Sequence, residues 1–345
     1  MEFNAAILVK SREPLVVDEI SLTKPLAPGQ VLVKIQFSGI CGAQINEIDA
    51  AKGPDRFLPH LLGHEGIGRV VEAGPMVKSV DVDDLVVLHW MPGEGIQSDP
   101  ASYEWGRNRL NAGWVTTLSE YTVASENRVT PIRTGLDQRY VPLFGCAATT
   151  AWGSLVNDAN FRLGESVVVL GTGGVGLLVV EAARAGGANP IIAVDIHEGR
   201  AQAASTVGAD HVFMAHEADL EDRIQQALPA RGADVIIETS GAKSMIEMSY
   251  RLGQHGARVI LVGVPRHDEP ATIDTLPLHF GMKYTGSKGG QVRPEVDIQR
   301  LLDLAERGTY RVGLLPLEEV SLNDVNLGIE AIRSGKPGRV IVKMA

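Results

Sequence analysis

The chain contains very little cysteine. Cys41 and Cys146 are the two cysteines among its 345 residues. Small secreted domains are stabilised by several disulfide bonds, and two cysteines cannot provide such a framework. The scarcity of cysteine therefore predicts a cytoplasmic protein. Each cysteine then needs its own explanation, as a small buried apolar side chain or as a metal ligand.

Positive charge and long apolar runs are also scarce. The chain has 32 lysines and arginines against 42 aspartates and glutamates, a net charge of −10, and no basic cluster. This balance argues against nucleic acid or an anionic membrane surface as a partner. The apolar runs near residues 167–180 are interrupted by glycine and are shorter than the roughly 20 residues that cross a bilayer. The N-terminal segment MEFNAAILVK lacks a signal-peptide pattern, so we expect neither a membrane span nor secretion.

The order of apolar segments predicts two domains. A chain of 345 residues exceeds the usual size of a single core. Up to about residue 147, short β-branched runs bounded by Gly, Pro and Asp predict a β-rich domain, whereas from about residue 164 buried strands alternate with helical segments. This alternation is typical of a parallel sheet covered by helices on both faces. The expected fold is α/β, with a β-rich domain over residues 1–147 and 290–345 and a doubly wound parallel-sheet domain over residues 148–289.

A glycine-rich motif precedes the first helical segment of the second domain. The sequence GTGGVG, residues 171–176, follows the apolar run VVVL. In a dinucleotide-binding turn, the first glycine permits a tight bend, the second lets the backbone approach the pyrophosphate, and the third lets the helix pack against the strand. The helix N-terminus then offers free N–H groups to the phosphates. The predicted cofactor-binding residues of this motif are Gly171, Gly173, Gly174, Val175 and Gly176.

Asp195 predicts which dinucleotide is bound. It ends the apolar run PIIAVD, 19 positions after Gly176 (195 − 176 = 19). A carboxylate at this spacing accepts hydrogen bonds from the ribose hydroxyls of adenosine and repels a 2′-phosphate. The alternative is a helix N-cap in a turn between strand and helix. We expect NAD as the cofactor. Arg200 is a further expected cofactor-binding residue, and its positive charge weakens the preference for NAD over NADP.

Three residues of the first half have the chemistry of metal ligands. Zinc at a catalytic site takes three N, S or O ligands from the protein and keeps a fourth position open. Cys41, His64 and Cys146 could supply such a set. No two of them form a local C-x-x-C pair, so their spacing alone leaves a metal site and ordinary buried side chains both open.

Segments along nearly the whole chain are similar to the zinc-dependent alcohol dehydrogenases of the medium-chain dehydrogenase/reductase superfamily. The matching segments, in the family's order, are PGQVLVKIQFSGICG, LLGHEGIGRVVEAGPMV, LSEYTV, TTAWGSL, LGESVVVLGTGGVGLL and IRSGKPGRVIVKM. The resemblance implies a GroES-like catalytic domain, a Rossmann cofactor domain and a homodimer or homotetramer. It also implies that one catalytic zinc is held by Cys41, His64 and Cys146, with Glu65 beside it as a transient ligand or an outer group.

The resemblance assigns roles to four further residues. Trp90 matches a position that walls the substrate channel, and a core tryptophan at the sheet edge is the alternative. Thr150 matches a residue that packs on the nicotinamide ring. Val262 and Val264 match backbone positions that contact its carboxamide.

The lobe at residues 89–114 departs from the family. Many relatives bind a second, structural zinc there through four closely spaced cysteines, and this stretch has none. We therefore expect one zinc per chain and a lobe held by the packing of its Trp and Tyr residues. The polar residues of the lobe form either a solvated face or part of the substrate cleft, and they are Asp99, Tyr103, Glu104, Arg107, Asn108 and Arg109.

The usual proton relay is also missing. Many relatives have Ser or Thr two positions after the first zinc cysteine and His five positions after it, where this chain has Ala43 and Asn46. Neither side chain titrates. Gln44 replaces the usual Asp beside the zinc-bound histidine, and we expect it to accept a hydrogen bond from the ring of that histidine. Three explanations are open. The proton leaves through water with the help of Glu65 or His89, or the substrate's own hydroxyls organise that water. The third explanation is that dehydrogenase activity has been lost.

The resulting prediction is a zinc-dependent enzyme that interconverts an alcohol and its carbonyl by hydride transfer with NAD(H). A polar secondary alcohol such as a polyol, sugar or cyclitol fits the altered relay. The rival hypotheses are a zinc-free medium-chain reductase and a non-catalytic NAD-binding protein. The individual substrate stays open at this stage.

Overall fold

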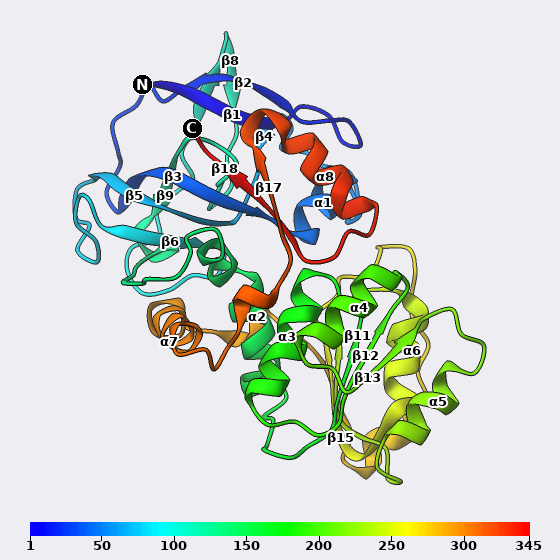
Figure 1. Ribbon diagram of the computed structural model, residues 1–345. Helices are drawn as coiled ribbons and strands as arrows, with labels where there is room; N and C mark the ends of the chain where they lie inside the picture. The colour runs from blue at the N-terminus through cyan, green and yellow to red at the C-terminus, as the bar shows by residue number, and fades with distance from the viewer.

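The computed structural model describes residues 1–345 and contains three β-sheets in two halves (Figure 1). One half holds an all-parallel sheet surrounded by helices. The other half holds two sheets that are built mainly from antiparallel pairs. No helix of the protein combines the length and apolarity that a membrane crossing requires.

The parallel sheet has six strands in the order β13-β12-β11-β14-β15-β16. They are β11 (Val167–Leu170), β12 (Ile191–Asp195), β13 (His211–Met214), β14 (Ala233–Glu238), β15 (Gly253–Leu261) and β16 (Lys283–Gly286). The connecting helices are α3 (Gly174–Ala185), α4 (Glu198–Val207), α5 (Leu220–Ala227) and α6 (Lys243–Leu252). β11 and β14 are buried along their whole length because helices cover both faces of the sheet. The predicted doubly wound Rossmann sheet is confirmed.

The larger sheet of the other half surrounds one long strand, β3 (Gln30–Ile40), which pairs with three others. The sheet order is β10-β6-β5-β3-β18-β17, and β9 also pairs with β3. The other strands are β5 (Glu65–Ala73), β6 (Leu85–His89), β9 (Tyr121–Ser125), β10 (Val129–Pro131), β17 (Leu317–Ser321) and β18 (Arg339–Lys343). Helices α1 (Gly42–Ile48) and α8 (Val325–Arg333) belong to this half. The chain therefore returns to its first half after completing the Rossmann sheet.

The third sheet contains the lobe that lacks cysteine. Its order is β4-β1-β2-β7-β8, with β1 (Glu2–Leu8), β2 (Val16–Ser21), β4 (His60–Leu61), β7 (Tyr103–Trp105) and β8 (Asn108–Leu110). The β7–β8 hairpin extends this sheet at the end of the molecule remote from the Rossmann sheet (Figure 1). The side chains of Glu104, Arg107, Asn108 and Arg109 are exposed, and Glu104 accepts a hydrogen bond from the hydroxyl of Thr23 at 3.1 Å. The polar residues of the hairpin therefore form a solvated edge and do not line the cleft between the halves.

The two halves share one apolar core. A cluster of 35 buried residues includes Ile67 and Ile341 of the large antiparallel sheet together with Val169 and Leu177 of the Rossmann half. Helix α2 (Ala147–Gly153) lies within this cluster and carries the chain from one half to the other. Because the core is continuous, packing fixes the metal-ligating half against the dinucleotide-binding half.

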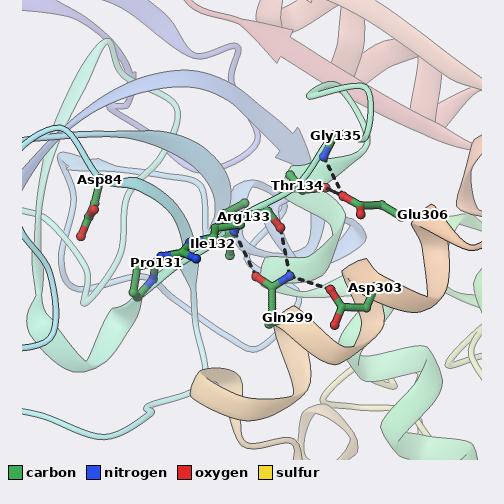
Figure 2. A pocket seen from close by; sticks show the side chains of 9 residues that line it. All are labelled: Asp84, Pro131, Ile132, Arg133, Thr134, Gly135, Gln299, Asp303 and Glu306. Atoms are coloured by element: carbon green, nitrogen blue, oxygen red, sulfur yellow. Dashed lines mark hydrogen bonds between the residues drawn. The ribbon is translucent and has the colours of Figure 1, made fainter.

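Helix α7 (Pro294–Glu306) follows the Rossmann sheet in the chain, and its residues Gln299 and Glu306 contact residues 133–135 of the first half (Figure 2). Gln299 exchanges two hydrogen bonds with the backbone of Arg133, at 3.0 and 2.9 Å, and Glu306 accepts from Thr134 and from the Gly135 N–H. These contacts border an open hollow of about 810 Å³, which is polar and includes none of the predicted site residues. The hollow therefore marks the docking of α7 and lies apart from the predicted site.

Candidate metal and dinucleotide site

Three elements bring together the residues that the sequence proposes as zinc ligands. Cys41 follows β3 and is the N-cap residue of α1, His64 directly precedes β5, and Cys146 lies between a 3₁₀ turn and α2. One ligand atom from each of the three residues lies within 4.8 Å of the others. The cysteines are 7% and 8% exposed. Residues separated by up to 105 positions (146 − 41 = 105) thus form one compact cluster.

The chemistry of this cluster fits zinc. The Nε2 atom of His64 is buried and has no hydrogen-bond partner. Buried polar atoms are normally paired, so the free lone pair of this nitrogen indicates a metal-binding position. The pKa of Cys41 is lowered because Cys146 donates a hydrogen bond to its sulfur and because Arg339 lies close by. A thiolate is the form of cysteine that binds metal. Two sulfur atoms and one imidazole nitrogen, with no fourth protein donor in the cluster, are the ligand set of an open zinc site.

Gln44 supports this cluster differently from the sequence expectation. Its Oε1 atom accepts the N–H of Cys41 at 2.8 Å, while its Nε2 atom faces Nδ1 of His64. The sequence predicts that the amide oxygen accepts from the ring of His64, but in the structure this oxygen is already used at the start of α1. For Nε2 of His64 to bind a metal, Nδ1 must carry the proton, so the amide of Gln44 has to turn its oxygen toward the ring.

A buried ion pair lies directly behind the cluster. Glu65 is fully buried and binds Arg339 of β18 at 2.5 Å, and it also accepts the N–H of Ala147 at 3.3 Å. Burial raises the pKa of Glu65 to about 7, although the positive charge of Arg339 acts in the opposite direction. Sequence reasoning found Glu65 but missed Arg339, because these residues are 274 positions apart.

Arg339 also connects the cluster to the glycine motif. A Cβ atom placed on Gly174 would lie 2.2 Å from Cδ of Arg339, so any side chain at position 174 would displace the arginine. The Nε atom of Arg339 is buried without a partner at this contact. Arg339 thus places a positive charge between the predicted metal ligands and the start of α3, where a dinucleotide pyrophosphate is expected.

The glycine motif has the conformation that the sequence predicts. Gly171 has φ +89°, a value that side chains disfavour, and it turns the chain after β11. A Cβ atom on Gly176 would lie 2.0 Å from the carbonyl oxygen of Gly171, so only glycine permits α3 to pack this close. Open space surrounds Gly173 at the N-terminus of α3. The backbone there is free to approach a phosphate group.

Asp195 and Arg200 lie at the next strand and helix. Asp195 is 4% exposed, and its carboxylate accepts the N–H and hydroxyl of Thr172 and the N–H of His197. It therefore fixes the glycine loop besides being a candidate for ribose binding. Arg200 donates to the carbonyl of Ile332 at the end of α8, at 3.1 Å. Both predicted roles in cofactor binding stay predictions.

The remaining predicted residues surround the same region. Thr150 is buried on α2, four residues after Cys146. Val262 and Val264 follow β15 at the carboxyl edge of the Rossmann sheet, and Val264 is half exposed. Trp90 follows β6 and is partly buried against Gly289, where a Cβ atom would lie 2.6 Å from its ring. The contact explains why the chain needs glycine opposite Trp90.

His89 cannot assist proton transfer as the sequence analysis suggested. Its Nδ1 atom lies 2.7 Å from the carbonyl of Met91, and its Nε2 atom lies 2.9 Å from the hydroxyl of Thr130. Both ring nitrogens are thus occupied. Burial lowers the pKa of His89 to about 4, so the ring is neutral at physiological pH.

This buried histidine predicts a pH dependence of stability. The unfolded state binds a proton on His89 below pH 6.5, whereas the folded state binds it only below about pH 4. We expect the free energy of unfolding to fall by up to about 3 kcal/mol from this group as the pH drops from 6.5 to 4. Urea unfolding of the wild type and of His89→Asn across this range measures the effect. Equal slopes of stability against pH in the two proteins would contradict it.

Polar contacts hold the cysteine-free lobe in addition to aromatic packing. Tyr103 is buried and packs edge-to-face on Phe3 with ring centroids 5.9 Å apart. The carboxylate of Glu126 accepts the backbone N–H groups of Lys78, Ser79 and Ile96 at 2.6 to 2.9 Å. These bonds join the lobe to the turns beneath it.

Arg128 makes the second polar connection. Its guanidinium donates to Oε1 of Gln97 at 3.1 and 2.9 Å and to the carbonyl of Trp90, and it lies 5.8 Å from the ring of Trp114. Only neutral acceptors bind this arginine within the lobe. Glu126 and Arg128 thus hold the loop that four cysteines would hold in a zinc-binding lobe, which the sequence analysis did not foresee.

Removing the Glu126 carboxylate should loosen the lobe. In Glu126→Ala three backbone N–H groups lose their acceptor, and we expect a loss of about 2–3 kcal/mol together with local opening at residues 91–99. Hydrogen exchange followed by mass spectrometry measures the opening directly. Glu104→Ala on the solvated hairpin is the matched control, and the same exchange pattern in both variants would refute the role of Glu126.

Two family models match this chain. The alcohol dehydrogenase GroES-like domain matches residues 27–134, and the zinc-binding dehydrogenase model matches residues 174–307. An alcohol dehydrogenase of Geobacillus stearothermophilus is 30% identical over 99% of this chain and 98% of its own length. An S-(hydroxymethyl)glutathione dehydrogenase of Synechocystis is 27% identical over 99% of this chain and its full length.

Solved structures share the fold. The benzyl alcohol dehydrogenase of Acinetobacter calcoaceticus superposes with a TM-score of 0.90 over both complete chains at 24% identity. An alcohol dehydrogenase zinc-binding domain protein of Burkholderia ambifaria reaches 0.92 over 100% of this chain and 99% of its own, also at 24% identity. The GroES-like and Rossmann halves predicted from the sequence are therefore confirmed.

All these matches describe one class of protein, the two-domain dehydrogenases that transfer hydride to a dinucleotide. The chain belongs to the zinc-dependent alcohol dehydrogenase family of the medium-chain dehydrogenase/reductase superfamily. It is accordingly an NAD-dependent oxidoreductase that interconverts alcohols and carbonyl compounds.

Proposed function

We propose that this enzyme interconverts a polar secondary alcohol, such as a polyol, sugar or cyclitol, and its ketone. Cys41, His64 and Cys146 hold a single catalytic zinc, and Glu65 lies beside it. Residues 1–147 and 290–345 form the catalytic domain, and residues 148–289 form the NAD-binding domain. The enzyme is cytoplasmic and acts as a homodimer or homotetramer.

The observation that carries this proposal is the cluster of Cys41, His64 and Cys146 with its buried, unpartnered imidazole nitrogen. The cluster lies next to a glycine turn of dinucleotide-binding type, since Arg339 contacts both Glu65 and Gly174. A metal able to polarise an oxygen and a hydride acceptor are thus expected within the same site.

Different residues of the site have different roles in the proposed reaction. When bound, zinc acts as a Lewis acid that lowers the pKa of a substrate hydroxyl, and NAD accepts the hydride. The glycine turn and the N-terminus of α3 hold the pyrophosphate, while Thr150, Val262 and Val264 orient the nicotinamide. Arg339 compensates negative charge at the cysteines and Glu65, so the site keeps its charge balance away from water.

Features of α1 and of Trp90 support a polar substrate. Ala43 is exposed at the start of α1, and open space surrounds Gly42, so the chain provides no hydroxyl where relatives place one. A substrate with hydroxyls on both sides of the reacting carbon supplies its own hydrogen-bonding groups there. Trp90 offers a partly exposed aromatic surface on which a sugar or cyclitol ring can stack.

The test is metal content followed by a substrate screen. Protein purified without chelator should contain about one zinc atom per chain and reduce NAD with a member of a polyol, sugar and cyclitol panel. Simple primary alcohols serve as the comparison set. A zinc content near zero after growth with added zinc would favour a zinc-free reductase. Bound zinc and NAD without turnover across the panel would favour a non-catalytic binding role.

A further inference from the structure

A carboxylate is buried at the edge of the Rossmann sheet where a dinucleotide is expected. The chain extends the sheet from β11 to one side through β12 and β13, and then returns to the other side of β11 with β14, β15 and β16. Open parallel sheets bind ligands outside the carboxyl ends of their strands at such a change of direction. Glu238 ends β14 directly beside Leu170 of β11, and it is fully buried. Glu238 therefore lies at the crevice between β11 and β14.

The carboxylate of Glu238 holds the turn that follows β14. Its Oε1 atom accepts the N–H of Ser240 at 2.7 Å and the N–H of Gly241 at 3.0 Å, and it also accepts the hydroxyl of Ser240. Burial raises the pKa of Glu238, while these neutral donors act in the opposite direction and no cation contributes. Burying a carboxylate without a cation costs free energy, so a merely structural position would more readily hold a neutral side chain.

The loop that follows β15 is held by the same residue. The main-chain carbonyl of Glu238 accepts the N–H of Val262 at 2.7 Å and the N–H of Gly263 at 2.9 Å. A Cβ atom on Gly263 would lie 2.2 Å from the nitrogen of Gly241 and 2.8 Å from Oε2 of Glu238. A Cβ atom on Gly241 would likewise lie 2.6 Å from the carbonyl oxygen of Val264. Glu238 thus packs the turn after β14 against the loop after β15.

The turn after β14 also contacts the glycine motif. The N–H of Thr239 donates to the carbonyl of Leu170 at 2.8 Å, and its hydroxyl donates to the carbonyl of Gly171 at 2.6 Å. A Cβ atom on Gly171 would lie 2.9 Å from the nitrogen of Ser240. Three loops at the carboxyl edge of the sheet are therefore in mutual contact, and Glu238 is the buried carboxylate that joins two of them.

Asp195 and Glu238 lie on opposite sides of β11. Asp195 ends β12 and is the predicted contact of the adenosine ribose. Each half of a dinucleotide-binding sheet binds one mononucleotide, so the nicotinamide half is expected over β14 and β15. Val262 and Val264, the predicted contacts of its carboxamide, belong to the loop that Glu238 holds.

We propose that Glu238 is a positioning residue that fixes the loops for the nicotinamide half of the cofactor. It acts through the turn at Ser240 and Gly241 and through the backbone at Val262. Binding of the adenosine half does not depend on it. This assignment rests on the nicotinamide contacts of the proposed function and is independent of the identity of the alcohol.

The test measures cofactor binding by the zinc-loaded Glu238→Gln variant without an alcohol. The amide keeps the size of the side chain, but it has one acceptor oxygen in place of two, and its NH₂ group faces N–H donors. The affinity for NADH, measured by fluorescence titration, should fall by about tenfold or more. The affinity for ADP-ribose, which lacks the nicotinamide ring, should be unchanged.

Asp234→Asn is the matched control. Asp234 is a buried carboxylate near the other end of β14, where it accepts the N–H of Ser166 at 3.0 Å and its hydroxyl at 2.8 Å. This variant also removes a buried charge from the same strand, but at the edge remote from the glycine motif. It should bind NADH and ADP-ribose as the wild type does.

Equal loss of affinity for NADH and ADP-ribose in Glu238→Gln, or no loss for either, would overturn the assignment. If this variant does not fold, Ser240→Ala gives the same comparison, because it removes one donor and keeps the carboxylate; its affinity for NADH should fall by about threefold. If NADH binding falls selectively and no alcohol is oxidised by the wild type, the proposed function fails and the role of Glu238 stands. If alcohols are oxidised and neither variant loses NADH affinity selectively, Glu238 does not position the nicotinamide.

Discussion

Replacing Cys146 by serine should release the zinc and reduce turnover by about 1,000-fold or more. A neutral hydroxyl is a poor substitute for a thiolate, so His64 and Cys41 are left as two protein ligands. Lewis-acid stabilisation contributes several kcal/mol to the transition state, and each 1.36 kcal/mol corresponds to a tenfold change in rate. Elemental analysis of the purified variant gives the zinc content, and NAD reduction with the best substrate gives the rate.

A matched variant separates loss of the ligand from disturbance of α2. Thr149→Ser keeps the hydroxyl that donates to the carbonyl of Cys146 at 3.0 Å, and it should retain zinc and activity. Both proteins should show the same circular dichroism. If Cys146→Ser kept one zinc per chain and full turnover, Cys146 would not be a ligand and the proposed cluster would be wrong.

Replacing Arg339 by methionine should be the most damaging change to stability. Glu65 would remain buried without its partner, and breaking a buried pair from one side costs about 3–5 kcal/mol. The thiolate of Cys41 would also lose the favourable charge interaction with Arg339. Chemical unfolding of the zinc-loaded protein measures the change in free energy.

A second substitution tests whether the pair itself is responsible. Adding Glu65→Gln to Arg339→Met removes the uncompensated charge, so the double variant should recover a large part of the lost stability. Arg333→Met, which removes an exposed arginine paired with Asp49, should cost less than about 1 kcal/mol. Additive effects of the two substitutions at 65 and 339 would show that the loss comes from packing alone.

The parts of the site that local sequence could predict are those set by backbone geometry or by a specific residue pattern. The turn at Gly171 and the close packing at Gly176 follow from conformations that glycine alone permits. Cys41, His64 and Cys146 had no informative spacing, and the resemblance to the family proposed them together. The structure then brought their ligand atoms within 4.8 Å.

The parts that sequence did not predict depend on contacts between distant segments. Arg339 is an ordinary arginine at the start of a β-strand until folding buries it against Glu65. Glu126 and Arg128 are likewise unremarkable polar residues, and only the turns they touch show that they hold the lobe. His89 looked like a free imidazole, because its hydrogen-bond partners, the carbonyl of Met91 and the hydroxyl of Thr130, depend on how β6 and β10 pair.

The position of β18 has a consequence for how the protein is made. This strand follows the entire Rossmann sheet in the chain, yet it pairs with β3 and β17 inside the first half and supplies Arg339. During synthesis the ribosome therefore releases β3, β5 and all three predicted zinc ligands long before the strand that completes their sheet. The Rossmann half can fold as a unit in the meantime, while the first half exposes an unpaired strand edge. A metal that bound before β18 docks would meet the three predicted ligands without Arg339, the cation that lies close to Cys41.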